Sequence, residues 1–213
     1  MKKKILVACL CVALAVLTIA GTTLAYLTAN DQVVNTFTVG NVQIKLDEAK
    51  ANADGTLVAN ADRVNANSYK LIPGHTYNKD PMVTVLKGSE ESYIKMTVTF
   101  TKAAQLDAIF APDGATLTSI FNGYDSTNWT AKGNTKDTDA NTRTYEFWYK
   151  ETVAAPDSNV ELDALFDSIT VPGNITNDQL SSIAGMTITV NAYAIQADGF
   201  ANAEAAWAAY AAA

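Results

Sequence analysis

Few residues of this 213-residue chain could perform acid–base or metal chemistry. Its one histidine, His75, excludes any catalytic site that needs two imidazoles, and the sequence contains no His-Glu-x-x-His motif. Catalytic zinc needs three protein ligands and an open position, so one histidine with scattered carboxylates would make a weak metal site. Because His75 follows Pro73-Gly74, a pair typical of turns, we interpret it as a turn or surface residue in preference to a metal ligand.

A second pattern resembles the start of a calcium-binding loop. Asp137, Asp139 and Asn141 have the spacing of the first, third and fifth ligands of such a loop. The complete loop also needs glycine at position six and glutamate at position twelve, where this chain has Thr142 and Trp148. The sequence therefore favours a solvated loop here, and the three residues are only weak alternative candidates for a metal site.

Nucleophilic catalysis requires a base beside the nucleophile, and the sequence offers no such pair. Both cysteines, Cys9 and Cys11, lie near the start, and no Gly-x-Ser-x-Gly segment accompanies His75. A net charge of -7 disfavours contact with phosphate backbones, so we predict no nucleic-acid partner. We predict no cofactor and no catalytic residue, although carboxylate pairs of the glycosidase kind depend on spatial separation and are left open.

The first residues have the three-part layout of a secretory signal peptide. Lysines at positions 2–4 precede the uncharged apolar run 5–20, and small residues at Thr23 and Ala25 mark a cleavage site. The run is shorter than the roughly 20 residues of a membrane span, and no basic stop-transfer cluster follows it. We therefore expect secretion, with cleavage between Ala25 and Tyr26, and not a retained membrane anchor.

A lipoprotein anchor is the competing interpretation of this region. Leu6-Val7-Ala8-Cys9 has the letters of a lipoprotein cleavage box, but the apolar stretch before Cys9 is too short for a signal-peptide core of about 7–15 residues. We therefore reject the lipid anchor. Cleavage after Ala25 leaves residues 26–213 as one domain without cysteine, which its hydrophobic core must stabilise without disulfides.

Strict alternation of apolar and polar residues predicts half-buried antiparallel strands. The segments with this pattern are residues 41–47, 94–100, 144–149 and 186–192, and residues 82–86, directly after Pro81, suggest a fifth strand. The first of them extends backwards through 37–39 across a plausible bend at Gly40. The polar segments 49–67 and 123–142 are predicted to be surface loops. Together these patterns predict an all-β fold, a jelly-roll-like antiparallel β-sandwich with a few short helices.

Helix signals are fewer than strand signals. Short helical segments are predicted at 105–110, at 162–166 through Leu162, Leu165 and Phe166, and at 176–183 with Thr176 or Asn177 as the cap. The clearest helix is C-terminal. Its apolar residues recur at three- and four-residue steps, after a cap at Asn202. We interpret the aromatic stripe of this helix as packing against the sheet.

Several of these segments together resemble a known family of secreted proteins. Residues 21–28 and 35–42 resemble the SipW-dependent type of signal peptide and the strand that follows it. The run Leu71-Ile72-Pro73-Gly74-His75, with Lys79-Asp80, resembles the Leu-x-Pro-Gly segment of the TasA/camelysin family. Residues 188–199 resemble the closing strand of these proteins. The resemblance covers both ends and the first third of the chain.

This resemblance implies a jelly-roll β-sandwich that a dedicated signal peptidase releases outside a Gram-positive-type bacterium. TasA-like relatives are subunits of extracellular biofilm fibres, which implies a structural role in the matrix or at the cell surface, with accessory matrix proteins as further partners. Camelysin relatives are described as surface metalloproteases, so a metallopeptidase with His75 as a ligand is one alternative. A monomeric adhesion or binding module, with a ligand held by its long loops, is another.

Fibre subunits of this family are thought to donate the mature N-terminus to a neighbour as an added strand. The apolar residues of that segment here are Tyr26, Leu27, Ala29, Val33 and Val34. Asn30-Asp31-Gln32 interrupts their alternation. An open sheet edge would offer the segment backbone hydrogen bonds and apolar pockets, and head-to-tail donation does not close on itself. We therefore expect a homopolymer that meets the membrane only during export; pairing of the segment within its own domain is the alternative.

Overall fold

The computed structural model of this chain describes residues 40–110 and 121–212. All of the described residues belong to one compact unit, Val39–Ala213. The predicted signal peptide, its cleavage site at Ala25 and Tyr26, and the strand extension at 37–39 lie outside the described residues. So do the five apolar residues Tyr26, Leu27, Ala29, Val33 and Val34.

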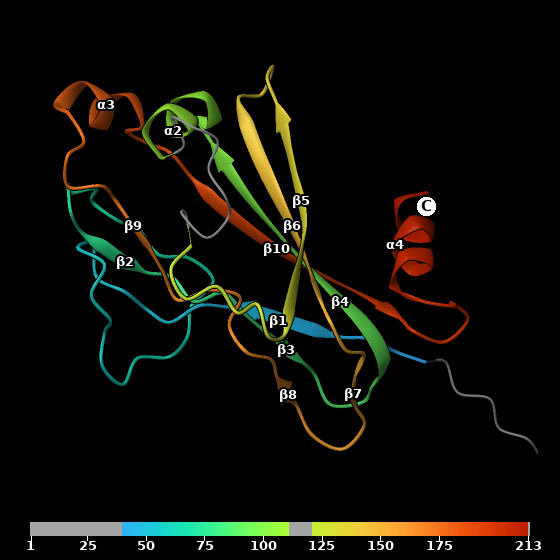
Figure 1. The fold of residues 1–213 in the computed structure, drawn as a ribbon. Coiled ribbons are helices and arrows are strands. Elements are labelled where there is room, and N and C mark those ends of the chain that lie inside the picture. The colour runs from blue at the N-terminus through green and yellow to red at the C-terminus, as the bar shows by residue number, and fades with distance from the viewer. Residues whose placement is uncertain (1–39, 111–120, 213) are drawn as a thin grey trace, which may run out of the picture. The chain divides into compact units, whose positions relative to one another are not determined.

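The described unit is built mainly from antiparallel sheets (Figure 1). The largest sheet has the order β10-β4-β6-β5, with β7 also paired to β4. Its strands are β4 (Ser89–Thr101), β5 (Trp129–Asp137), β6 (Thr142–Tyr149), β7 (Val153–Ala155) and β10 (Ile188–Gln196). A second sheet contains β1 (Ile44–Asp47), β3 (Met82–Val85) and β8 (Val160–Glu161) in the order β1-β3-β8. A third pairs β2 (Thr76–Asn78) with β9 (Ser168–Thr170), and no sheet closes into a barrel within the described residues.

The predicted strands are confirmed at all five segments, which form β1, β3, β4, β6 and β10. The longest strand, β4, shows why the alternation is informative. Its apolar residues, from Ile94 to Phe100, are buried on one face, whereas Lys95, Thr97 and Thr99 lie half-buried on the other. A strand places successive side chains on opposite faces, so this pattern can be satisfied only by an extended chain with one face on the core.

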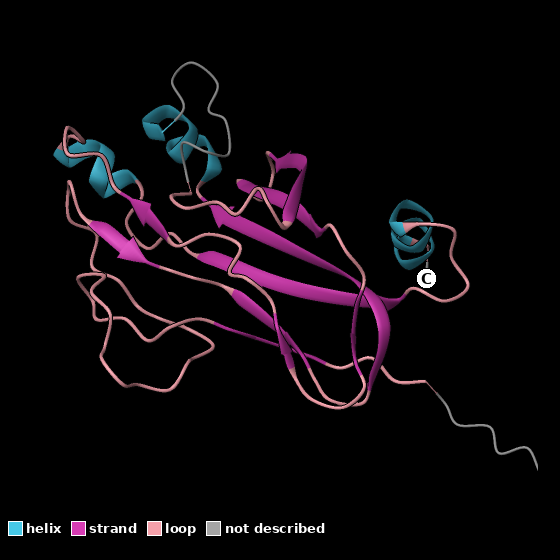
Figure 2. Cartoon of the chain, turned by 60° about the horizontal axis from the view of Figure 1, so that its bottom comes forward, coloured by secondary structure: helices cyan, strands magenta, loops and turns pink. Residues whose placement is uncertain are grey.

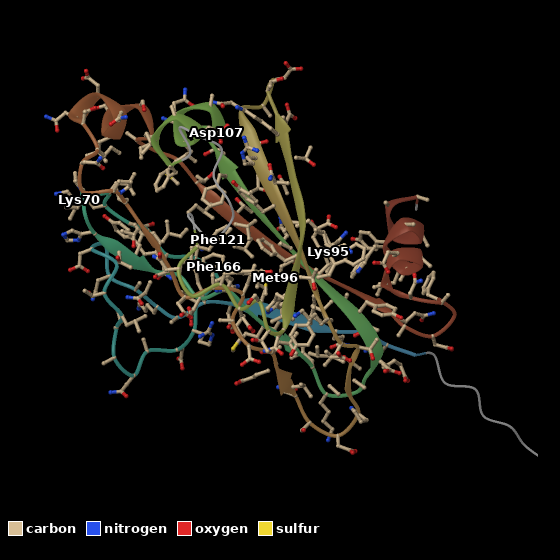
Figure 3. The ribbon with its side chains drawn as sticks, in the orientation of Figure 1. Lys70, Lys95, Met96, Asp107, Phe121 and Phe166 are labelled. Carbon is tan, nitrogen blue, oxygen red and sulfur yellow. The ribbon has the colours of Figure 1, made fainter. Side chains whose placement is uncertain are left out.

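The core joins side chains of the different sheets to those of the connecting segments. Phe121 lies at its centre, stacked on Phe166 with 4.3 Å between ring centroids and in edge contact with Tyr145 and Phe147. Met96 of β4 belongs to the same buried cluster, and Figure 3 labels Met96, Phe121 and Phe166 in the interior. Such aromatic contacts add specific geometry to the large apolar area that these rings bury.

The helix predicted at 162–166 is wrong, although its three apolar residues are all buried. This segment follows β8 without helical structure. Its backbone N–H groups bond to distant carbonyls, with Leu162 donating to Val83 at 2.9 Å and Leu165 donating to Pro81 at 3.0 Å. A spacing of three and four residues therefore reflects contact with the core here and not a helical face.

The surface loop predicted at 123–142 is also wrong over residues 129–137, which form β5. Apart from Trp129, the side chains of β5 are exposed on both faces. The segment therefore has no apolar alternation, and its pairing with β6 through the backbone makes it a strand. The other predicted loop, 49–67, is confirmed as irregular chain with isolated bridges such as Glu48 to Val64.

The described residues form three short helices, α2 (Ala103–Phe110), α3 (Asn177–Ser182) and α4 (Ala203–Ala211). Their predicted caps are confirmed. Thr176 forms a capping box with Gln179, and the Asn202 side-chain oxygen accepts the Ala205 N–H at 2.9 Å. Figure 2 shows α2 and α3 at one end of the sheets and α4 at the other.

Candidate functional site

A cleft of about 420 Å³ lies where β1 and β10 approach each other. Leu46 and Asp47 of β1 line one side, and residues 188–190 of β10 line the other. Part of the lining is polar, because Glu48, Asn67 and Lys79 also contribute to it. The two sheets thus form a recess with an apolar wall and a charged end.

Both strands beside this cleft are edge strands. Among the described residues, β1 pairs only with β3 and β10 pairs only with β4. The second edge of each strand therefore keeps backbone N–H and C=O groups that another strand could pair with. These two edges make the cleft a place where an extended segment could be added to the fold.

The apolar side chains at these edges are only half-buried. They pack against the core but stay partly exposed, and they are Ile44, Leu46, Ile188, Val190, Ala192 and Ala194. An added strand with apolar residues facing the core would remove this surface from water, at roughly 25 cal/mol for each Å² of apolar area.

The opposite edge of the same sheet, β5, is protected against such pairing. It has lysines at positions 132 and 136 and a register shift between Ala131 and Gly133, where Gly133 adopts φ +118°. Charged side chains and bulges are the usual devices that keep an exposed strand from pairing with another chain. The nine residues of β10 contain no charged residue, and their register against β4 is regular. Of these two edges, β10 is therefore the one suited to accept a strand.

The charged end of the cleft contains a three-residue cluster in which a buried ion pair contacts the half-buried Asn67. Glu48 and Lys79 are only 5% and 8% exposed, and their carboxylate and ammonium groups are 2.5 Å apart. The other carboxylate oxygen of Glu48 accepts a hydrogen bond from the side-chain amide of Asn67 at 3.0 Å. Sequence patterns gave no sign of this cluster, because its members are separated along the chain and are joined only by the fold.

A second ionic group centred on Arg63 lies beside it. The guanidinium contacts the Asp47 carboxylate at 2.5 Å and the Asp80 carboxylate at 2.8 Å, and it donates to the Asp80 carbonyl at 2.8 Å. Burial of Asp47 opposes its ionisation, but hydrogen bonds from Lys45 and Arg63 outweigh burial and hold the pKa of Asp47 below its usual range. These contacts fasten the irregular segment after β1 to the chain before β3.

The sequence-predicted metal candidates lie on separate parts of the fold (Figure 1). His75 is exposed in the turn before β2, where Gly74 adopts φ +77°, so the interpretation as a turn residue is confirmed. The other candidates belong to the turn between β5 and β6. Within the described ranges, no three His, Cys, Asp or Glu side chains converge on a common point where a metal could bind.

The acidic turn uses its polar atoms to stabilise the backbone. The Asp137 carboxylate accepts the N–H groups of Asp139 and Ala140 at 3.0 and 2.9 Å. The Asn141 side-chain oxygen accepts the N–H of Ala104 at 2.9 Å, at the start of α2. The calcium-like spacing therefore coincides with a hairpin turn whose side chains satisfy local donors.

Fold and cleft together define a mostly β, antiparallel protein with an open strand edge beside a half-buried apolar wall. No protein-family model matches this sequence, and no curated protein matches it significantly. In the part of the chain that the structure describes, no helix is both long and apolar enough to cross a membrane.

Proposed function

We propose that this chain is a secreted structural protein, a subunit of an extracellular matrix or biofilm fibre that assembles head to tail by N-terminal strand donation. A dedicated signal peptidase cuts between Ala25 and Tyr26, and residues 26–213 form a jelly-roll-like β-sandwich. The main partner is a second copy of the same chain, and accessory matrix proteins join the fibre. Residues 26–34 of one subunit are the donor strand.

The open cleft beside β10 is the observation that carries this proposal. A donor strand needs an unpaired edge for its backbone and a half-buried apolar wall for its side chains. The β10 edge offers both, and its nine residues match the length of segment 26–34. The protected edge at β5 supports the same conclusion, because β10 is then the one of these two edges that is open to pairing.

Burial of only a few apolar side chains of the donor strand would make strand donation favourable. Burying a Leu- or Val-sized side chain contributes about 1.5–3 kcal/mol. Three or four such residues from the donor segment would therefore offset an association cost of at least about 4 kcal/mol. Because donor and acceptor are different surfaces of one subunit, each added copy presents a new open cleft, and the assembly grows as a filament.

Deletion of residues 26–34 from the processed protein tests the proposal. We expect the wild-type protein to form fibres under the electron microscope and the deletion variant to remain monomeric in solution. Fibres from the deletion variant at the same concentration would contradict strand donation. If the segment instead pairs within its own domain, the wild type stays monomeric and the deletion lowers its thermal stability.

The acceptor side has its own matched pair of variants. Val190→Lys places a charge in the cleft and should prevent fibre growth, whereas Thr135→Lys places the same charge on the exposed strand β5 and should leave growth unchanged. Far-UV circular dichroism checks that both variants keep their sheet content. If the Val190→Lys variant is folded and still forms normal fibres, the acceptor edge is not at β10.

A further inference from the structure

The cluster of Glu48, Asn67 and Lys79 brings together the parts of a reaction centre and is more than an ion pair. One carboxylate contacts both the lysine nitrogen, at 2.5 Å, and the side-chain amide nitrogen of Asn67, at 3.0 Å. Each oxygen of the Glu48 carboxylate thus contacts one of the two partners, the amine of Lys79 or the carboxamide of Asn67. This arrangement places a nucleophile, an electrophile and a proton carrier at the same end of the cleft.

The hydrogen bonds of Asn67 fix the orientation of its side chain. Its oxygen accepts the N–H of Ala51 at 2.9 Å, and its nitrogen donates to the carbonyl of Ala49 at 2.9 Å as well as to Glu48. Turning the amide over would leave the Ala51 N–H facing another donor, so the amide nitrogen must point toward Glu48. The Ala51 N–H is therefore aimed at the oxygen on which negative charge would develop during attack on the amide carbon.

Glu48 and Lys79 have little contact with water, whereas Asn67 is half-buried at the wall of the cleft. The Glu48 and Lys79 side chains are nearly buried, and Tyr69 closes one side with its hydroxyl donating to the Asn78 carbonyl at 2.7 Å. Burial, followed by the nearby Glu48 carboxylate, raises the pKa of the Tyr69 phenol, so this hydroxyl stays protonated.

We propose that Lys79 and Asn67 form an intramolecular isopeptide bond and that Glu48 is the catalytic acid–base of this reaction. Glu48 takes a proton from the Lys79 ammonium, and the neutral amine attacks Cγ of Asn67. The oxygen that becomes negative accepts the Ala51 N–H. Glu48 passes its proton to Nδ2 of Asn67 and removes a second proton from the attacking nitrogen. The Cγ–Nδ2 bond breaks, a new Cγ–Nζ amide remains, and ammonia leaves, carrying off the excess proton as ammonium.

Such a bond would serve a specific structural purpose in this chain. The processed domain is predicted to lack cysteine, so it has no disulfide to fasten its irregular segments. The cross-link would tie the segment after β1 to the chain between β2 and β3 by a bond that reducing agents do not cleave. This inference does not rest on the proposed fibre function, because it concerns only the folded subunit.

Intact-mass measurement of the purified, folded full chain tests the bond. After denaturation, we expect the protein to weigh less than its sequence mass by one ammonia. Protease digestion should then give a branched peptide joining the segments around Asn67 and Lys79, which tandem mass spectrometry identifies. A wild-type protein at its full sequence mass after prolonged incubation in the folded state would overturn the proposal.

Four variants identify the chemistry. Lys79→Arg and Glu48→Gln should have their full sequence masses, since one removes the nucleophile and the other the proton carrier. Asn67→Asp should lose one water instead of one ammonia through the same attack. Asn65→Ala, which changes another residue lining the cleft, should keep the ammonia deficit. A deficit that survives in Lys79→Arg would come from a different reaction, such as cyclisation at Asn122-Gly123, and would contradict the assignment.

Discussion

Arg63 connects three parts of the chain that are distant in sequence. Its guanidinium bonds to the carboxylates of Asp47 and Asp80 and to the backbone carbonyls of both residues. The Asp47 side chain is only 2% exposed, so its charge depends on these donors. A planar guanidinium with several fixed donors suits such a site better than an ammonium group.

Replacing Arg63 with alanine should therefore lower the free energy of unfolding by about 2–3 kcal/mol, because it leaves the buried Asp47 carboxylate with only the exposed Lys45 as a charged partner. Urea unfolding at neutral pH measures this change. Lys45→Ala is the matched control. Lys45 also contacts Asp47, but its side chain is 57% exposed, so its loss should cost less than about 1 kcal/mol.

The same contact gives a pH dependence with a definite sign. The pKa of Asp47 is lowered in the folded state, so its contribution to stability is present above the ordinary aspartate pKa and is lost as the pH falls through the lowered value. The stability difference between wild type and Arg63→Ala should therefore shrink below about pH 4. A difference that stays constant down to about pH 2, below the range in which aspartates normally titrate, would show that Asp47 does not depend on Arg63.

At the scale of an element, α4 shows how a short helix is held on a sheet. Asn202 caps its first turn, and Trp207 is buried against Trp148, with 6.3 Å between ring centroids. The ammonium of Lys95, on β4, lies 4.5 Å from the Trp207 ring and 5.4 Å from the Tyr210 ring. Figure 3 shows Lys95 on the side of the sheet that faces α4. These contacts, and not helix propensity alone, stabilise a helix of nine residues.

Trp207→Ala should consequently destabilise the protein by about 3–5 kcal/mol, because it removes the large buried side chain that anchors α4. Tyr210→Ala should cost less than about 1 kcal/mol, since Tyr210 is 44% exposed. Thermal unfolding followed by near-UV circular dichroism compares the two variants. Equal losses from both would mean that the helix is not anchored through Trp207.

At the scale of the whole molecule, the two edges of the large sheet are treated differently. One edge, β5, carries lysines and a bulge, whereas the other, β10, is regular and uncharged. A protein that must stay monomeric would be expected to protect both edges. The asymmetry therefore favours a molecule that pairs through one side only, as the proposed fibre requires.

Hydrogen exchange of backbone amides can compare the two edges of the large sheet before and after assembly. Backbone amides of β10 and β1 should gain protection when monomers form fibres, because an added strand supplies their missing partners. Amides at the outer edge of β5 should exchange at the same rate in both states. Protection that appears at β5 and not at β10 would contradict the proposed acceptor edge.

Local patterns in the sequence were sufficient for much of the fold. The alternation from Ile94 to Phe100 has only one low-energy solution, a strand with one face buried. Asn202 can satisfy free N–H groups only at the start of a helix. These features depend on neighbouring residues, so they can be read from the chain directly. They established a mostly β protein with capped short helices and a histidine in a turn.

Features that depend on distant residues were decided only by the tertiary structure. The strand β5 has no apolar periodicity of its own, and it forms because β6 pairs with its backbone. The segment from Leu162 to Phe166 has helical spacing but bonds to residues near β3. The open edge of β10 and the cluster of Glu48, Asn67 and Lys79 exist only after folding has brought separate segments together. Burial and pairing are properties of the packed chain, so no local pattern could encode where they would occur.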